Sequence, residues 1–167
     1  MSAANRFPLG MDLEAGTTHA EETGAPRLKV VTDSVFDPDR DDHFIRRDGR
    51  VFAGTHLIIE VVDGEGLDDE RRIQAALRDC VLRCGATLLH IHTHKFTPQG
   101  VSGVAVLAES HISVHTWPEI GYGAFDVFMC GDAEPWQAVE VLREAFSASN
   151  VIVREFLRGE DVISARL

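Results

Sequence analysis

The spacing of hydrophobic residues changes period several times along the chain, and each change predicts an element of secondary structure. Apolar or alternating runs of strand length predict strands at 56–62, 86–96, 101–107, 112–117, 122–130 and 150–157. Between 67 and 85 the apolar residues instead recur at helical spacing, and Gly85 stops that helix. A second helix is predicted from Asp132, as its cap, to Phe146, with Trp136 in its buried stripe.

The order of these elements predicts the fold class. A strand, a helix, several strands, a helix and a last strand are typical of an α+β two-layer sandwich. In such a fold a mainly antiparallel β-sheet carries its helices on one face. Residues 51–167 are long enough to form one domain of this kind with its own core. The sheet face without helices then needs cover, or a partner.

The first fifty residues have a different character. Residues 1–26 mix Ala, Gly, Thr, Glu and Pro without periodicity, as in chains that bury too little surface to offset their ordering entropy. Residues 37–50 are rich in charged side chains and have a loop-like pattern. We therefore expect residues 1–50 to be a poorly ordered, acidic extension of the domain.

Charge and composition exclude several functions. A formal net charge of −11 and a pI near 5.1 argue against nucleic acid, whose phosphates demand a basic surface. No segment approaches the roughly 18 consecutive apolar residues of a membrane span, and the N-terminus lacks a signal-peptide core, so a cytoplasmic protein is expected. The odd number of cysteines, Cys80, Cys84 and Cys130, indicates neither a disulfide framework nor a zinc knuckle.

The stretch from 100 to 132 concentrates reactive side chains, with Ser110 at or near the turn between two predicted strands. A serine hydroxyl in a strained turn can attack the preceding carbonyl, here that of Glu109, and shift the acyl group from nitrogen to oxygen. Removal of the serine α-proton then cuts the chain and, after loss of ammonia, leaves a pyruvoyl group. Such a carbonyl cofactor forms a Schiff base with a substrate amine and withdraws electrons as carbon dioxide leaves.

The same residues form a family pattern. In their order and spacing, Glu109-Ser110-His111, His115, Trp117-Pro118-Glu119 and Cys130-Gly131 closely resemble the prokaryotic S-adenosylmethionine decarboxylase proenzymes. The segment Phe-Thr-Pro-Gln-Gly-Val-Ser-Gly at 96–103 resembles the same family. The resemblance runs from about Gly54 to Glu155.

The resemblance implies a role for each residue in self-processing and catalysis. Ser110 would become the pyruvoyl group, and Glu109 would end the upstream chain. His115 would be the base for processing, and Ser102 would help to orient the ester intermediate. Cys130 would be the general acid that returns a proton to the substrate α-carbon after decarboxylation.

The resemblance also implies a substrate and a partner. Phe96 and Trp117 would contact the adenine ring of S-adenosylmethionine, and Glu119 would bind its ribose hydroxyls. The product would be the aminopropyl donor for spermidine synthesis. Two cleaved protomers would form a homodimer whose active sites draw on both chains. Glu60 aligns with an acidic family position near the active site, although a strand-edge carboxylate is at least as often simply solvated.

Other interpretations stay open. Taken singly, Ser110 is an ordinary turn residue, His115 and Trp117 are core residues, and Cys130 is a small buried hydrophobe. Relatives with the same processing chemistry decarboxylate arginine or ornithine. A binding or regulatory protein that keeps the fold but does not cleave itself is a further alternative.

A zinc protein is the last alternative. His90, His92 and His94 alternate along a predicted strand, so their imidazoles would point from one face and could ligate zinc. The chemistry implied by the resemblance needs no metal, and no metal is expected.

Overall fold

Six strands form one antiparallel sheet that dominates the computed structural model, which describes residues 44–166. The elements in chain order are β1 (Ile45–Arg47), β2 (Arg50–Phe52), β3 (Gly54–Val62), α1 (Glu70–Arg83), β4 (Leu88–Lys95), β5 (Val101–Leu107), β6 (Ser110–Trp117), the short 3-10 helix η1 (Pro118–Ile120), β7 (Tyr122–Met129), α2 (Gln137–Ala145), β8 (Asn150–Arg158) and α3 (Glu160–Ser164). The strand order is β4-β5-β6-β7-β3-β8, and every neighbouring pair is antiparallel.

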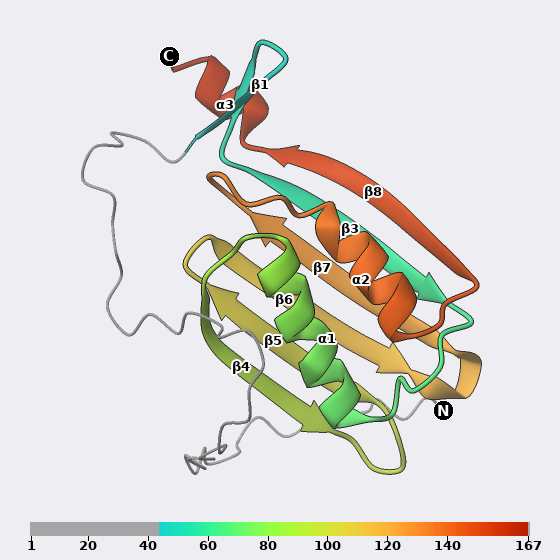
Figure 1. Ribbon diagram of the computed structural model, residues 1–167. Helices are drawn as coiled ribbons and strands as arrows, with labels where there is room; N and C mark the ends of the chain where they lie inside the picture. The colour runs from blue at the N-terminus through green and yellow to red at the C-terminus, as the bar shows by residue number, and fades with distance from the viewer. Residues whose placement is uncertain (1–43, 167) are drawn as a thin grey trace, which may run out of the picture.

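Helices α1 and α2 lie on the same face of this sheet (Figure 1). Alternate residues of the central strands point toward them and are almost completely buried, among them Leu57, Ile112 and Phe125. Leu77 and Phe146 fill the core from the helix side. The predicted α+β two-layer sandwich is confirmed. Within residues 44–166, no helix is long and apolar enough to cross a membrane.

Helix α1 begins at Glu70 because Asp69 caps it. The Asp69 carboxylate accepts hydrogen bonds from the backbone N–H groups of Arg71 and Arg72 at 2.9 and 3.1 Å. The predicted start at residue 67 was therefore three residues too early. Cys80 and Cys84 are buried on the inner side of this helix, and burial raises the pKa of both thiols.

Helix α2 is shorter than predicted, and its cap was wrong. Trp136, not Asp132, is the N-cap residue, and it makes no side-chain capping bond. The Trp136 side chain is 47% exposed rather than buried in the helix stripe. Its indole N–H donates to Glu155 Oε1 at 3.2 Å, which holds the ring at the surface beside β8.

The hairpin of β1 and β2 occupies residues for which a loop was expected. Arg47 of the hairpin donates to Glu155 at 2.8 Å, and Arg50 lies 3.4 Å from Glu160 of α3. Phe52 is completely buried. The hairpin spans the expected boundary at residue 50, so an ordered part of the chain begins before it. The remainder of the expected extension, residues 1–43, lies outside the described residues.

The second face of the central strands carries no helix in the described part of the chain. Strand register places six histidines on it: His56, His90, His92, His94, His111 and His115. Several apolar side chains on the same face are substantially exposed, including Val106 at 40% and Phe156 at 51%. We call this surface the uncovered face.

Candidate active site

The turn between β5 and β6 holds Ser110 in a backbone conformation that side chains rarely adopt, with φ at 142°. Neighbouring contacts fix the turn. The Ala108 N–H donates to the Thr87 carbonyl at 3.0 Å, and the Thr87 N–H donates to the Glu109 carboxylate at 2.8 Å. On the Ser110 side of the Glu109–Ser110 peptide bond, the backbone is therefore strained. On the Glu109 side, the hydrogen bond from Thr87 anchors the chain.

Cys130 provides two hydrogen-bond donors to the carbonyl oxygen of that peptide bond. Its backbone N–H lies 3.0 Å from the Glu109 oxygen, and its Sγ lies 3.1 Å from the same atom. The contact follows from sheet register, because Ser110 pairs with Met129 and Cys130 is the next residue. Two donors on one carbonyl oxygen are the arrangement that stabilises an oxyanion when the carbonyl carbon is attacked.

The Cys130 thiol is half-buried, and burial is the main reason that its pKa lies above the ordinary thiol value of 9.0. The nearby Glu109 carboxylate acts in the same direction. The thiol therefore keeps its proton at neutral pH, as a hydrogen-bond donor or a general acid requires.

Ser102 and His115 form a second arrangement on the uncovered face. They are register partners on β5 and β6, and Ser102 Oγ lies 2.7 Å from His115 Nδ1. Both belong to the predicted site, but His115 stands five residues from Ser110 on an extended strand. At about 3.3 Å per residue, the two residues are about 16 Å apart. His115 therefore cannot reach Ser110 of its own chain.

The three predicted substrate-binding residues lie at the end of the sheet that is remote from Ser110: Trp117 ends β6, Phe96 follows β4 and Glu119 lies in η1. Trp117 is seven residues from Ser110, or about 23 Å, and its side chain is 42% exposed. Phe96 is 47% exposed at the same end of the sheet. Glu119 accepts a hydrogen bond from Gln99 at 3.0 Å, which joins η1 to the loop that follows Phe96.

The predicted site residues thus fall into two groups within one chain. We call Glu109, Ser110 and Cys130 the cleavage cluster. We call Phe96, Ser102, His115, Trp117 and Glu119 the distal cluster. The geometry brings the members of each cluster to one region but does not bring the two clusters together.

Sequence reasoning did not single out Tyr122, and it left open whether Glu60 belongs to the site or is solvated. The Tyr122 hydroxyl donates to Glu60, and this bond is the main cause that raises the pKa of Tyr122 to about 12. The Tyr122 ring also lies 5.3 Å from that of Trp117. Glu60 is therefore a bonded group on the uncovered face rather than a solvated carboxylate. Only the register between β3 and β7 reveals the contact.

The histidines of β4 do not assemble a metal site. The rings of His90 and His92 lie nearly parallel with centroids 6.5 Å apart, and His94 packs edge-on against Phe96 at 4.8 Å. Within residues 44–166, no group of three or more His, Cys, Asp or Glu residues is arranged to hold a metal ion. The zinc hypothesis gains no support from this geometry.

The family assignment follows from sequence comparison. Residues 55–159, well over half of the chain, match the sequence model of S-adenosylmethionine decarboxylase. The chain belongs to the S-adenosylmethionine decarboxylase family. The matched range contains both clusters and leaves out the β1–β2 hairpin and α3.

Individual relatives of the S-adenosylmethionine decarboxylase family agree with this assignment. The S-adenosylmethionine decarboxylase proenzyme of Methanococcus aeolicus is 48% identical over 112 residues, covering 65% of this chain and 96% of the relative. That of a Synechococcus species is 49% identical over 118 residues, covering 69% and 92%. The crystal structure of the Aquifex aeolicus adenosylmethionine decarboxylase is similar with a TM-score of 0.59 and 28% identity, covering 64% of this chain and 91% of that one.

Proposed function

We propose that this protein is a self-cleaving S-adenosylmethionine decarboxylase, which makes the decarboxylated aminopropyl donor for spermidine synthesis. One observation carries the proposal: the carbonyl of the strained Glu109–Ser110 peptide bond accepts hydrogen bonds from both the backbone and the thiol of Cys130. A turn that served only to connect two strands would not need this arrangement. The family match of residues 55–159 points to the same chemistry.

The first step of self-cleavage is an acyl shift. The Ser110 Oγ attacks the Glu109 carbonyl carbon, and its proton passes to a base. The carbonyl oxygen gains negative charge, which the two Cys130 donors stabilise at 3.0 and 3.1 Å. The carbon–nitrogen bond then breaks, and the Ser110 nitrogen takes up a proton. An ester replaces the amide.

The second step cuts the chain. A base removes the Ser110 α-proton, the bond between Cβ and the ester oxygen breaks, and Glu109 leaves as a carboxylate. Residue 110, now a dehydroalanine, rearranges to an imine, and water adds to its α-carbon and displaces ammonia, which leaves a pyruvoyl group. The Thr87 N–H holds the Glu109 side chain at 2.8 Å, so the departing end stays in place. We assign the base to His115 of a second copy of the chain, because His115 of the same chain cannot reach Ser110. The Nδ1 of His115 is oriented by Ser102.

The pyruvoyl group supplies a carbonyl that condenses with the substrate amine and withdraws electrons as carbon dioxide leaves. The residues of the chain do the rest. The neutral Cys130 thiol returns a proton to the substrate α-carbon. Phe96 and Trp117 offer exposed aromatic faces for the adenine ring, and Glu119 offers a carboxylate to the ribose hydroxyls.

We further propose that the active site combines two chains. His115 is about 16 Å and Trp117 about 23 Å from Ser110 of the same strand, so the two clusters of one chain cannot act on one substrate. A homodimer with two-fold symmetry, packed through the uncovered faces, would set the distal cluster of one protomer opposite the cleavage cluster of its partner. The exposed apolar side chains Val106, Ile152 and Phe156 support burial of this face.

The intact mass of the purified protein under denaturing conditions tests the cleavage. The expected result is two fragments, 1–109 and 110–167, the second without a free amine and reactive toward hydroxylamine. Carbon dioxide release from S-adenosylmethionine, arginine and ornithine then identifies the substrate. A single stable chain of 18.4 kDa would contradict the proposal, and release from arginine or ornithine alone would correct the substrate.

Mixing two inactive variants tests the combined site. Ser110→Ala lacks the nucleophile, and His115→Ala lacks the base, so neither chain should be cleaved when expressed alone. In a mixed dimer, one site joins Ser110 of the His115→Ala chain to His115 of the Ser110→Ala chain. We expect cleavage to appear on co-expression, and only in the His115→Ala chain, as fragment masses distinguish. Absence of cleavage in a mixed dimer verified by native mass spectrometry would show that each chain processes itself.

A further inference from the structure

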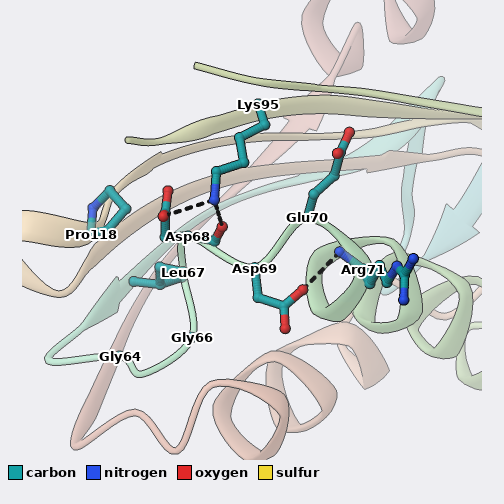
Figure 2. Close-up of a pocket in the computed structure, with 9 residues that line it drawn as sticks. All are labelled: Gly64, Gly66, Leu67, Asp68, Asp69, Glu70, Arg71, Lys95 and Pro118. Carbon is teal, nitrogen blue, oxygen red and sulfur yellow. Dashed lines mark hydrogen bonds and ion pairs between the residues drawn. The ribbon is translucent and has the colours of Figure 1, made fainter. Parts of the chain in front are cut away.

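Asp68, in the segment before α1, contacts both ends of the loop of residues 96–99, which lies between β4 and β5 and carries Phe96. Its Oδ1 accepts from the Gly100 N–H at 2.9 Å, and its Oδ2 accepts from Lys95 Nζ at 2.9 Å. Its backbone carbonyl also accepts from Lys95 Nζ at 2.8 Å. Asp68, Lys95 and Pro118 line one pocket, and Figure 2 shows the Asp68 carboxylate and carbonyl turned toward the Lys95 ammonium group at its edge.

Lys95 and Gly100 flank the loop on its two sides. Inside the loop, the Phe96 N–H donates to the Gly100 carbonyl at 2.8 Å. At its far end, Gln99 donates to Glu119 at 3.0 Å. A single carboxylate therefore fixes both stems of the loop that presents Phe96, and the loop in turn contacts Glu119.

The surroundings of Asp68 keep it charged. Its hydrogen bond to Lys95 is the largest cause that lowers the pKa of the carboxyl group, followed by its bond to the Gly100 amide. Charged hydrogen bonds are stronger than neutral ones. Asp68 lies beside β4 and η1 at the end of the sheet that carries Phe96 and Trp117, away from Glu109 and Ser110 of the same chain.

We propose that Asp68 is a positioning residue, whose carboxylate holds the loop of residues 96–99 in the conformation that binds the adenosyl part of the substrate. The inference rests on the proposed function, in which Phe96 contacts adenine. Asp68 itself touches neither the substrate nor the peptide bond that is cut. Its loss should therefore weaken substrate binding and leave both self-cleavage and the chemical step nearly unchanged.

The test compares Asp68→Ala with Asp69→Ala in the full chain. Both changes remove one carboxylate before α1, but within residues 44–166 the hydrogen bonds of the Asp69 carboxylate are those that cap the helix. For Asp68→Ala we expect KM for S-adenosylmethionine and Kd for 5′-methylthioadenosine, which lacks the reacting amino acid part, each to rise about tenfold. The kcat should stay within about twofold. Asp69→Ala should lower the thermal midpoint but leave KM and Kd unchanged.

Two milder variants keep the test decisive if Asp68→Ala folds poorly. Asp68→Asn keeps an acceptor for Gly100. Lys95→Met removes both bonds of the Lys95 ammonium group to Asp68 but leaves the bond between Asp68 and Gly100. Each variant should therefore raise KM less than Asp68→Ala. Equal KM values in the wild type and all three variants would overturn the inference, as would an equal rise in Asp69→Ala. Failure of the proposed function would be seen separately, in a wild type that releases no carbon dioxide from S-adenosylmethionine.

Discussion

Ser110→Ala is expected to remain a single uncleaved chain with no decarboxylase activity. The substitution removes the oxygen that we propose attacks the Glu109 carbonyl, so neither the ester nor the pyruvoyl group could form. Every other contact of the turn, including both donors from Cys130, involves backbone or other side chains and stays in place. Intact mass under denaturing conditions and carbon dioxide release measure the two effects.

Ser149→Ala is the matched control for Ser110→Ala. Ser149 is exposed, hydrogen-bonds to Asp63 at 2.8 Å, and lies in the same downstream fragment. Its substitution should leave cleavage and turnover at the wild-type level. Two fragments from Ser110→Ala, cut at the original position, would rule out the serine mechanism.

Cys130→Ala is expected to lose most turnover and to slow self-cleavage. The variant lacks the acid that we propose protonates the substrate α-carbon, and general acid catalysis contributes about a hundredfold or more to rate. For cleavage, the Cys130 N–H still donates to the Glu109 carbonyl at 3.0 Å, but the thiol donor at 3.1 Å is gone. Cleavage should therefore proceed, but slowly and incompletely. Turnover must be normalised to the cleaved fraction measured by intact mass.

Cys80→Ala separates this effect from the loss of any buried thiol. Cys80 is fully buried against α2, so the Cys80→Ala substitution should cost about 1 kcal/mol of stability and leave turnover per cleaved chain unchanged.

The pH profile of the wild type gives a second check on the role of Cys130 as an acid. Because burial raises the pKa of the Cys130 thiol from the ordinary value of 9.0, the protonated form persists through neutral pH. Turnover should fall only as the pH rises through this raised pKa. Full activity of Cys130→Ala would remove the proposed role.

The strands and helices of the sandwich could be predicted because each buries one face. Its hydrophobic residues therefore recur with a period of two in a strand or 3.6 in a helix. Features that depend on contacts between residues distant in sequence could not be predicted. Trp136 occupies a helical position that predicts burial, but its indole N–H bonds to Glu155 on β8 and keeps it at the surface. The β1–β2 hairpin has only three residues per strand and is held by charged contacts such as Arg47 with Glu155.

The residues of the candidate site could be named from sequence, but their arrangement could not. Ser110 and His115 are close in the motif and far apart in space, because an extended strand separates five residues by about 16 Å. Cys130 is twenty residues from Ser110 in sequence, yet register brings its N–H and thiol to the Glu109 carbonyl. Proximity in these cases depends on strand pairing, which local patterns do not reveal.

The strand order has a consequence for the cleaved molecule. A cut between Glu109 and Ser110 leaves β3, β4 and β5 on the upstream polypeptide and β6, β7 and β8 on the downstream one. Because β3 lies between β7 and β8, and β5 pairs with β6, the two polypeptides are interleaved within one sheet. The cut falls at the first residue of β6 and leaves the strand pairs beyond it in place, so the pieces could not come apart without unfolding the sheet. The proposed cleavage would therefore replace a one-chain fold by an obligate heterodimer of fragments, whose dissociation and denaturation would be the same event.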